Sequence, residues 1–431
     1  MQITFYGGAQ EVGRVALLLE NKKQTKNLLL DCGIKLGEET EYPQIQDEEL
    51  GRIRNITISH AHLDHSGYLP HVYSRGVKPK IFLTKPTRDL MGVLLADYER
   101  IHKEKVGAEK ASSRGLGYGH GHKRRVFSIK DVNDVMKDAS MAEYGEPFNA
   151  DFRVSFHHAG HVLGSAVTLI EHENHKVAYT GDICMRKTRI LDPCIRHLHA
   201  DTLVMESTYG SKEDILPSYK ESYQKIITII RETLDNGGHV VIPSFAVGRA
   251  QEILLALDDY MRSGALPQTR IFVEGMINKA MKIYRHNAYY ANDDIKKRIL
   301  MSEDDPFNSP NFHKSRSKTR EDVLKEPSVI VTTSGMLTGG PVQFYLERLG
   351  NDPKNTLLFV GYQAEGTPGS RVIAGERTLK FADEREINLK MRVEQVRISG
   401  HADFNELLHF ARNVSGLKKI FLIHGEKTDL L

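Results

Sequence analysis

The sequence predicts an α/β protein in which one domain is interrupted by another. Short apolar strands separated by polar turns run as far as Met205, whereas strands and helices alternate after Tyr209. The last forty or so residues, with a strand, a helix and a strand, resemble the first part of the chain in their pattern of elements. We therefore expect stacked sheets flanked by helices at 1–208 and 385–431, with a doubly wound parallel sheet at 209–384 inserted between them.

Alternating apolar residues bounded by turn residues predict the strands of the first domain. These strands run from Met1 to Phe5, Val15 to Leu19, Asn27 to Leu30, Asn55 to Ile58, Lys80 to Leu83, Arg153 to Phe156, Ala166 to Ile170, Lys176 to Tyr179 and Thr202 to Met205. Helical spacing of apolar residues is clearest from Thr87 to His102 and from Lys130 to Asp138.

The inserted domain begins with a helix, because isoleucines between Ile226 and Leu234 share one helical face and Asn-Gly-Gly at 236–238 ends it. A second helix is expected from Ala250 to Met261, with strands from His239 to Ile242, Arg270 to Val273, Ser328 to Thr332 and Thr356 to Val360. In the returning segment we expect a strand from Met391 to Ile398, a helix from Asn405 to Asn413 and a strand from Lys419 to Ile423.

Composition excludes several classes of protein. The 431 residues carry 59 basic and 56 acidic side chains, so the overall charge is nearly balanced. Binding of a polyanion would therefore depend on local basic patches. Three cysteines are too few for a disulfide framework, the opening residues lack the form of a signal peptide, and no apolar run approaches membrane-spanning length. We therefore expect a cytoplasmic protein with no membrane contact.

One turn concentrates side chains that bind metals. The stretch SHAHLDHSG, from Ser59 to Gly67, follows a predicted strand and holds His60, His62, Asp64 and His65. A turn that only needs to be soluble would use Lys, Glu or Ser, because imidazoles are costly to bury without partners. The alternative is a turn whose histidines are merely hydrogen-bonded, but the H-x-H-x-D-H spacing favours a metal site.

Other candidate residues also follow the carboxyl ends of predicted strands, where open sheets build their sites. They are Asp31, His161, Asp182, Glu206 and His424. Imidazole nitrogens and carboxylate oxygens suit zinc, and one carboxylate can bridge two ions. Two ions sharing a hydroxide would supply a nucleophile near neutral pH, so hydrolysis needs no serine, and no G-x-S-x-G motif occurs.

The motifs HAHLDH, GHVLGS, TGD, EST, SGHAD and IHGE, in this order, resemble those of the metallo-β-lactamase fold in the β-CASP nuclease family. The chain is especially similar to the nuclease subunit of the cleavage and polyadenylation specificity factor and its archaeal and bacterial relatives. The resemblance covers nearly the whole chain. It implies an αββα sandwich that carries an inserted β-CASP domain.

The resemblance implies two zinc ions per chain. One would be held by His60, His62 and His161, the other by Asp64, His65 and His424, with Asp182 bridging both. Asp31 would orient a ligand histidine from behind. Taken without the family, Asp31 could be a turn former at a strand end.

Glu206 and His401 match the family's acidic residue and second signature histidine. A histidine held by a carboxylate can donate a proton to the leaving oxygen, which the metal-bound hydroxide cannot do from the opposite side. Without the family, His401 could equally be a helix-entry residue followed by the cap Asp403.

Two segments of the inserted domain suit phosphate binding. PSFAVGRAQEILLAL from Pro243 and TTSGMLTGGP from Thr332 place small residues and backbone amides at strand-to-helix junctions. Substrate contacts are therefore expected from Arg249, Ser334, Gly335, Gly339 and Gly340. The alternatives are ordinary tight turns and, for the arginine, a structural ion pair. No Walker motif occurs, so no nucleotide cofactor is expected.

Basic residues gather in KSRSKTR from Lys314 and in HKRRVF from His122. Either run could line a nucleic-acid channel or could be a solvated face.

With the resemblance, these features predict a zinc-dependent ribonuclease that hydrolyses phosphodiester bonds of single-stranded RNA. The alternatives are a DNA-directed nuclease, a small-molecule hydrolase such as a thioesterase, and a non-catalytic RNA-binding subunit of a processing complex. His424 favours RNA over DNA, and the complete ligand set argues against a silent subunit. The choice between endonuclease and 5′→3′ exonuclease stays open, as do a homodimer and processing-complex partners.

Overall fold

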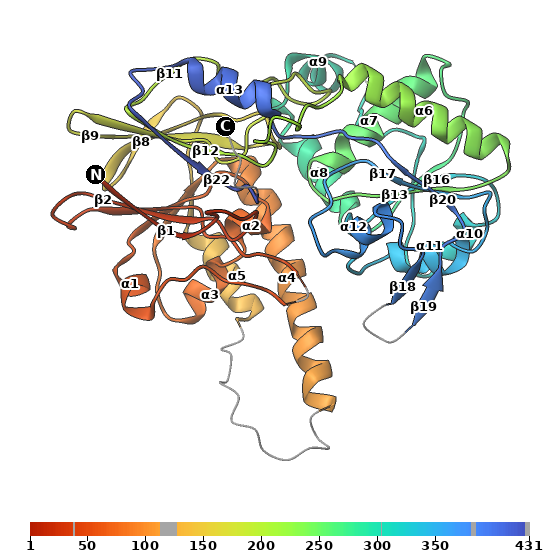
Figure 1. Ribbon diagram of the computed structural model, residues 1–431, viewed down its shortest axis with the longest axis horizontal. Coiled ribbons are helices and arrows are strands. Elements are labelled where there is room, and N and C mark those ends of the chain that lie inside the picture. Colours follow the sequence, from red (N-terminus) through yellow and green to blue (C-terminus); the bar gives the residue numbers. More distant parts are fainter. Residues whose placement is uncertain (38, 113–126, 303, 381–384, 427–431) are drawn as a thin grey trace. The chain divides into compact units, whose positions relative to one another are not determined.

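The computed structural model of the chain describes residues 1–37, 39–112, 127–302, 304–380 and 385–426. These residues form two units (Figure 1). Unit 1 comprises Met1–Arg186, Pro193–Asp214 and the chain from His401 onward, and unit 2 comprises Lys187–Asp192 and Ile215–Gly400. Unit 2 is therefore inserted in unit 1, while the domain limits 1–208, 209–384 and 385–431 stay a prediction.

The first sheet of unit 1 has the strand order β1-β2-β3-β4-β5-β6. Its strands are β1 (Gln2–Gly7), β2 (Ala16–Glu20), β3 (Asn27–Leu30), β4 (Asn55–Thr57), β5 (Lys80–Leu83) and β6 (Ala139–Met141). Neighbours are antiparallel from β1 to β3 and parallel from β3 to β6. Because β3 and β4 run parallel, Asp31 and the histidine turn leave the sheet at the same edge.

The second sheet of unit 1 has the strand order β22-β12-β10-β9-β8-β7. Its strands are β7 (Pro147–Ala150), β8 (Phe152–His158), β9 (Ala166–His172), β10 (His175–Tyr179), β12 (Thr202–Glu206) and β22 (Lys419–Ile423). The neighbours β10, β12 and β22 are parallel, so Asp182, Glu206 and His424 reach one edge from three adjacent strands.

Alternating side chains divide the core of unit 1 into two layers. Val177 and Tyr179 of β10 are buried with leucines of β2 and β3, between the two sheets. Ala178 points the other way, into a cluster with Leu407 and Phe410 of helix α13 (Phe404–Arg412). Helices α4 (Lys85–Ser112) and α5 (Ile129–Asp138) lie on the side of the first sheet (Figure 1), which completes an αββα sandwich.

Unit 2 is built on a wholly parallel sheet with the strand order β15-β14-β16-β13-β17-β20. Its strands are β13 (Val240–Pro243), β14 (Ile271–Val273), β15 (Phe312–Lys314), β16 (Val329–Thr332), β17 (Thr356–Phe359) and β20 (Arg392–Gln395). Helix α6 (Tyr219–Asp235) precedes β13, and α7 (Arg249–Arg262) follows it. The connection from α6 to β13 passes Gly238, where only glycine fits, because a Cβ there would lie 1.9 Å from the carbonyl oxygen of Lys354.

The strand expected from Met391 to Ile398 is the shorter β20, which extends the sheet of unit 2 beside β17. Besides the strands β6, β7 and β15, several short elements were not predicted from the sequence. They are α1 (Asp47–Arg52), α2 (Leu63–Ser66), α3 (Leu69–Ser74), β11 (Leu198–His199), α8 (Ile277–His286), η2 (Ala288–Tyr290), α9 (Asp293–Met301), α10 (Arg320–Val323), α11 (Val342–Leu349), α12 (Pro368–Ile373), β18 (Thr378–Lys380), β19 (Glu386–Asn388) and β21 (Val414–Ser415). In the part of the chain that is described, no helix has the length and apolar character needed to cross a bilayer.

Candidate metal centre

The histidine turn leaves β4 and continues into the short helix α2. His62 is the N-cap of α2, and Asp64 and His65 lie inside it. Gly33 allows the chain after β3 to approach this helix, because a Cβ there would lie 1.6 Å from the carbonyl oxygen of Asp64. The Cys32 amide donates to the carbonyl oxygen of His65 at 2.8 Å, which fixes the turn against β3.

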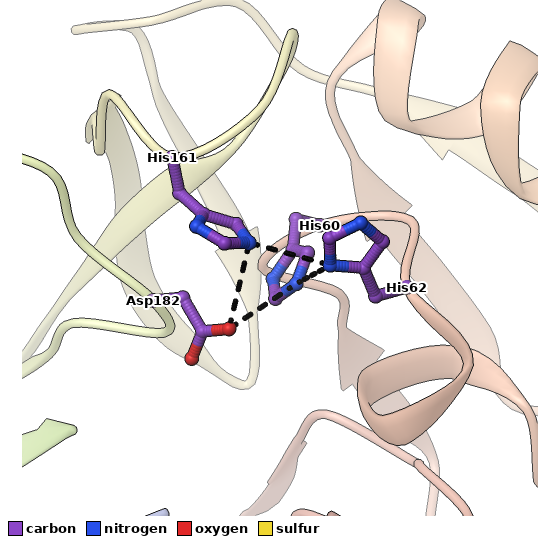
Figure 2. Close-up of side chains that lie close together, drawn as sticks. All are labelled: His60, His62, His161 and Asp182. Carbon is purple, nitrogen blue, oxygen red and sulfur yellow. Dashed lines mark hydrogen bonds and ion pairs between the residues drawn. The ribbon is translucent and has the colours of Figure 1, made fainter. Parts of the chain in front are cut away.

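Three imidazoles and one carboxylate form a first donor group (Figure 2). His60 Nε2 and His161 Nε2 lie 3.1 and 3.3 Å from His62 Nδ1. Asp182 Oδ2 lies 3.5 Å from His60 Nε2 and 3.6 Å from His161 Nε2. A zinc tetrahedron with bonds of about 2.0–2.1 Å has edges of about 3.3–3.4 Å, so these four atoms have the spacing of ligands around one ion.

Asp182 directs its other oxygen toward a second donor group, formed with Asp64, His65 and His424. Asp182 Oδ1 lies 3.5 Å from His65 Nε2 and 3.7 Å from His424 Nδ1. Asp64 Oδ2 lies 3.3 Å from His424 Nε2 and 4.0 Å from His65 Nε2. One carboxylate therefore faces both groups, as a ligand that bridges two ions would.

Two atoms between these groups indicate that a cation fits there. Within the described ranges, His65 Nε2 and Asp182 Oδ1 are buried side-chain atoms without a hydrogen bond. His65 Nδ1 lies 2.6 Å from Asp31, so a neutral ring with its proton on Nδ1 turns a lone pair toward the Asp182 carboxylate. Two acceptors in this position repel each other unless a proton or a metal ion lies between them.

The electrostatics of the cluster favour a positive charge between His65 and Asp182, which a proton or a metal ion can supply. Burial favours the neutral imidazole, yet Asp182 and Asp31 raise the pKa of His65 well above its usual value, because their negative field attracts positive charge. Burial, together with the neighbouring His65, lowers the pKa of His60 well below its usual value. A neutral His60 is the form that can bind a metal ion.

Asp31 is fully buried and is the residue against which His65 is oriented. Its carboxylate accepts hydrogen bonds from the Ser59 amide and the Ser59 hydroxyl, both at 2.6 Å, and from the Tyr179 hydroxyl. The sequence analysis did not identify Ser59 or Tyr179 as partners. The available signal was adjacency, since Ser59 precedes the HAHLDH motif and Tyr179 precedes TGD.

Glu206 holds His401 beside the first donor group. His401 Nδ1 donates to Glu206 Oε2 at 2.8 Å, and the same carboxylate accepts from the Thr208 hydroxyl and the Ile183 amide, each at 2.7 Å. Burial alone would lower the pKa of His401, but Glu206 and Asp182 raise it to about 9. His401 is therefore cationic at neutral pH and can donate a proton from Nε2, which Glu206 does not occupy.

The loop that carries His401 is tied to the loop that carries Asp182. Arg186 contacts Asp403 Oδ2 and Glu406 Oε1, both at 2.6 Å. Asp403 also caps α13 by accepting the Glu406 amide at 3.1 Å. His401 thus combines both readings of its motif, a position at a helix entry and a bond to a carboxylate.

The residues expected to contact phosphate lie in unit 2. Arg249 begins α7 after β13, and the loop after the adjacent β16 holds the others, namely Ser334, Gly335, Gly339 and Gly340. This loop is partly closed on itself, because the Ser334 amide donates to the Gly339 carbonyl oxygen at 3.2 Å and the Ser334 hydroxyl accepts the Thr338 amide at 3.1 Å. The two loops abut, since a Cβ on Gly335 would lie 2.9 Å from the Phe245 amide nitrogen. A role in phosphate binding stays a prediction.

One of the two basic runs lies within the described residues, and the other lies almost wholly outside them. In the run from His122, residues 122–126 lie outside the described residues. In the run from Lys314, Arg320 makes an ion pair with the buried Glu274 at 2.6 Å, which gives that arginine a structural role. Lys314, Arg316 and Lys318 are exposed.

Models of known protein families match three parts of the chain. The metallo-beta-lactamase superfamily matches residues 10–232 and the Beta-Casp domain residues 250–372. A domain described as a Zn-dependent metallo-hydrolase RNA specificity domain matches residues 386–431.

Two archaeal relatives cover the whole of this chain. The transcription termination factor FttA of Methanothermobacter thermautotrophicus is 36% identical over 449 residues, which span 100% of this chain and 68% of the relative. The protein of the same name from Pyrococcus abyssi is 36% identical over 456 residues, spanning 100% and 67%. The crystal structure of a protein of unknown function from Enterococcus faecalis V583 shares the fold, with a TM-score of 0.57 at 14% identity over 100% of this chain and 95% of that one.

Proposed function

We propose that this chain, which belongs to the metallo-β-lactamase superfamily and carries a Beta-Casp domain, is a zinc-dependent ribonuclease acting on single-stranded RNA. Members of this family are metal-dependent nucleic-acid hydrolases. The observation that carries the proposal is the position of Asp182, whose two oxygens face two separate groups of histidines and carboxylates. Such a carboxylate can hold two ions next to each other.

The residues of the two donor groups would hold the metal. His60, His62 and His161 would bind one ion, Asp64, His65 and His424 the other, and Asp182 both. When bound, the zinc pair supplies a water that is acidic enough to attack at neutral pH, and positive charge to stabilise the phosphodiester in the transition state. Asp31 would keep the imidazole of His65 oriented, with its proton on Nδ1 and its lone pair on Nε2.

His401 would protonate the oxygen that leaves. Its Nδ1 is occupied by Glu206, so the proton available to substrate is the one on Nε2. Because the pKa of His401 is raised to about 9, its imidazole carries this proton at neutral pH. Glu206 balances the positive charge and aims the ring.

RNA is the proposed substrate for two reasons. The carboxyl-terminal part of the chain matches a domain described by its RNA specificity, and the archaeal relatives are named as transcription termination factors. We propose that the chain acts in the cytoplasm, with a nascent transcript as the strand that it cuts. Partner subunits and a second copy of this chain stay predictions.

The test compares wild-type protein with His62→Ala, His401→Ala and metal-stripped protein on RNA and DNA strands labelled either at the 5′ end or internally. We expect RNA cleavage to disappear after metal removal and in His62→Ala, and to return to the stripped wild type when zinc is added. His401→Ala should lose about 10²–10⁴-fold in rate while its zinc content stays that of the wild type.

The matched control is His409→Ala, which removes an exposed histidine from α13 and should cleave RNA like the wild type. Comparison of the product ladders from the two labels identifies internal cuts or stepwise removal from the 5′ end. Cleavage of DNA but not RNA, or RNA cleavage that survives complete zinc removal, would contradict the proposal.

A further inference from the structure

Unit 2 contains a pocket of about 330 Å³ whose lining shares no residue with the candidate metal centre. One wall is helix α8, and the opposite wall comes from the adjacent strands β14 and β15 with the segment 307–309. β15 is the outermost strand of the sheet in unit 2. The volume is at the lower end of the range usual for sites that bind small ligands, and matches one nucleotide better than a larger group.

Helix α8 lines the pocket with a single face. The residues that it contributes have the spacing i, i+3, i+4, i+7 and i+8, namely Asn278, Met281, Lys282, Arg285 and His286. The helix is anchored by residues such as Ile277 and Tyr284, which are buried. Polar and basic groups on α8 are therefore held at fixed positions along the pocket by the packing of the apolar face.

Strand β15 supplies an aromatic ring and a second lysine. Phe312 and Lys314 are two residues apart, so they project from the same face of the strand into the pocket. The residue between them, His313, projects the other way and lies with its ring centroid 5.6 Å from that of Phe272. Lys314 is the register partner of Val273, which also lines the pocket at the end of β14.

The pocket is positively charged. Its lining includes Lys282, Arg285, His286 and Lys314 and, among the residues that the structure describes, no carboxylate. Asp305 makes an ion pair with Arg285, so that arginine is neutralised. Lys282 and Lys314 are exposed, and neither has an ion-pair partner within the described chain. Two unneutralised ammonium groups thus face a cavity that also has an apolar wall.

We propose that this pocket binds one nucleotide of a single-stranded RNA, with the phosphate at Lys282 and Lys314 and the base against Phe312. Basic side chains beside an aromatic ring are the combination by which proteins hold single strands, since the charges follow the backbone and the ring stacks on a base. The inference rests on the proposed action on RNA and adds to it an anchoring site outside the metal centre. It also gives the first residue of the KSRSKTR run a specific role.

The experiment measures binding without cleavage. Fluorescence anisotropy of a labelled 20-nucleotide RNA is titrated with the full chain in the His401→Ala background, at several salt concentrations. Adding Lys282→Ala and Lys314→Ala together should raise Kd about tenfold and reduce the slope of log Kd against log salt by about 0.7, because the two lysines share one phosphate and each phosphate neutralised on a single strand contributes about 0.7. Lys279→Ala, an exposed lysine on α8 that does not line the pocket, should leave both values unchanged.

Two further arms identify the ligand. Phe312→Leu keeps the apolar volume but removes the aromatic ring, and should weaken RNA binding without changing the salt slope. Adenosine monophosphate should compete with the RNA only weakly, and its competition should be lost in the double lysine variant. A mononucleotide that binds as tightly as the RNA would show that this is a site for a free nucleotide, which overturns the assignment.

Unchanged Kd and salt slope in the double lysine variant, or equal losses in Lys279→Ala, would also overturn it. These outcomes are independent of hydrolysis. If the wild-type chain cuts no RNA but RNA binding still depends on Lys282 and Lys314, the proposed catalytic function is wrong and the proposed nucleotide site in the pocket is supported. If RNA is cut normally and binding ignores both lysines, the pocket fails and the catalytic function stands.

Discussion

The two donor groups that share Asp182 differ in how closely their atoms are organised. In the first group the neighbouring donor atoms are separated by 3.1 to 3.6 Å, close to the edges of a zinc tetrahedron. In the second they are separated by 3.3 to 4.0 Å, and His424 faces Asp64 with Nε2 but Asp182 with Nδ1, so no single ring nitrogen faces both carboxylates. The Asp64 side chain also keeps 31% of its surface exposed. The first group is thus set for an ion by the fold itself, whereas the second needs small side-chain movements.

The reason for the difference lies in the partners of each group. One turn supplies ligands to both groups and is fixed by backbone hydrogen bonds to the carbonyl oxygens of Asp64 and His65, so the difference must come from the other ligands. His424 comes from the far end of the chain, and its Nδ1 lies 2.9 Å from the Thr208 hydroxyl. Rotation of that hydroxyl or of the ring would free His424 for a metal ion. We therefore expect the two ions to bind with unequal affinity, the first group being the tighter.

The largest expected effect comes from removing what the groups share. Asp182→Asn should lower zinc content at both positions and reduce RNA cleavage by about 10³-fold or more, because the neutral amide cannot bridge two cations. Elemental analysis and single-turnover cleavage check this. Asp192→Asn, on an exposed carboxylate, should behave like the wild type. If the Asp182→Asn protein retained two tightly bound zinc ions, Asp182 would not be a ligand that the two groups share.

A smaller effect is expected at the residue behind the second group. Asp31→Asn keeps the shape but gives His65 a weaker acceptor, so zinc affinity should fall by about 10–100-fold at the position that His65 serves. The affinity at the first group should fall less, since His60 is linked to Asp31 only through the Ser59 hydroxyl, which lies 3.1 Å from His60 Nδ1. Competition with a zinc-binding dye resolves the two affinities. Equal losses at both positions would contradict a separate role for Asp31.

The smallest effect is expected on the proton donor, as a change in pH dependence. A group with a raised pKa is protonated below that pKa, so activity that needs the acid form of His401 should fall as the pH rises through about 9. Glu206→Gln removes the main charge that raises this pKa and should move the alkaline limb of the pH–rate profile to lower pH, with zinc content unchanged. An alkaline limb that stays in place would show that another group controls it.

Much of the candidate metal centre could be recognised in the sequence because the residues that the structure brings together lie in short motifs at the ends of apolar strands. His60, His62 and Asp182 are recognisable from residue type and position, and the parallel strands then bring such positions together. The supporting contacts could not be predicted in the same way. Tyr179 reaches Asp31 across 148 positions of sequence, and that meeting depends on how the two sheets face each other.

Unit 2 shows the same difference between elements that can be recognised in the sequence and contacts that depend on the folded arrangement. The four central strands β13, β14, β16 and β17 were predicted within one residue, whereas the edge strand β15 was missed and β20 was expected in the first domain. Helix α8 was also left unassigned, although Ile277, Ala280 and Tyr284 have helical spacing. The pocket beside α8 could not be predicted, because it joins residues from a helix, two strands and a loop whose register only the folded sheet defines. Lys314 gained its proposed role from that register, while Arg320 of the same basic run pairs with Glu274.

The most direct test of the shared carboxylate is a calorimetric zinc titration of metal-free wild type, His62→Ala and His424→Ala. Our account predicts two zinc ions per chain in the wild type with distinct affinities, loss of the tighter one in His62→Ala, and loss of the weaker one in His424→Ala. A single zinc ion in the wild type, or the same residual binding in both variants, would contradict it.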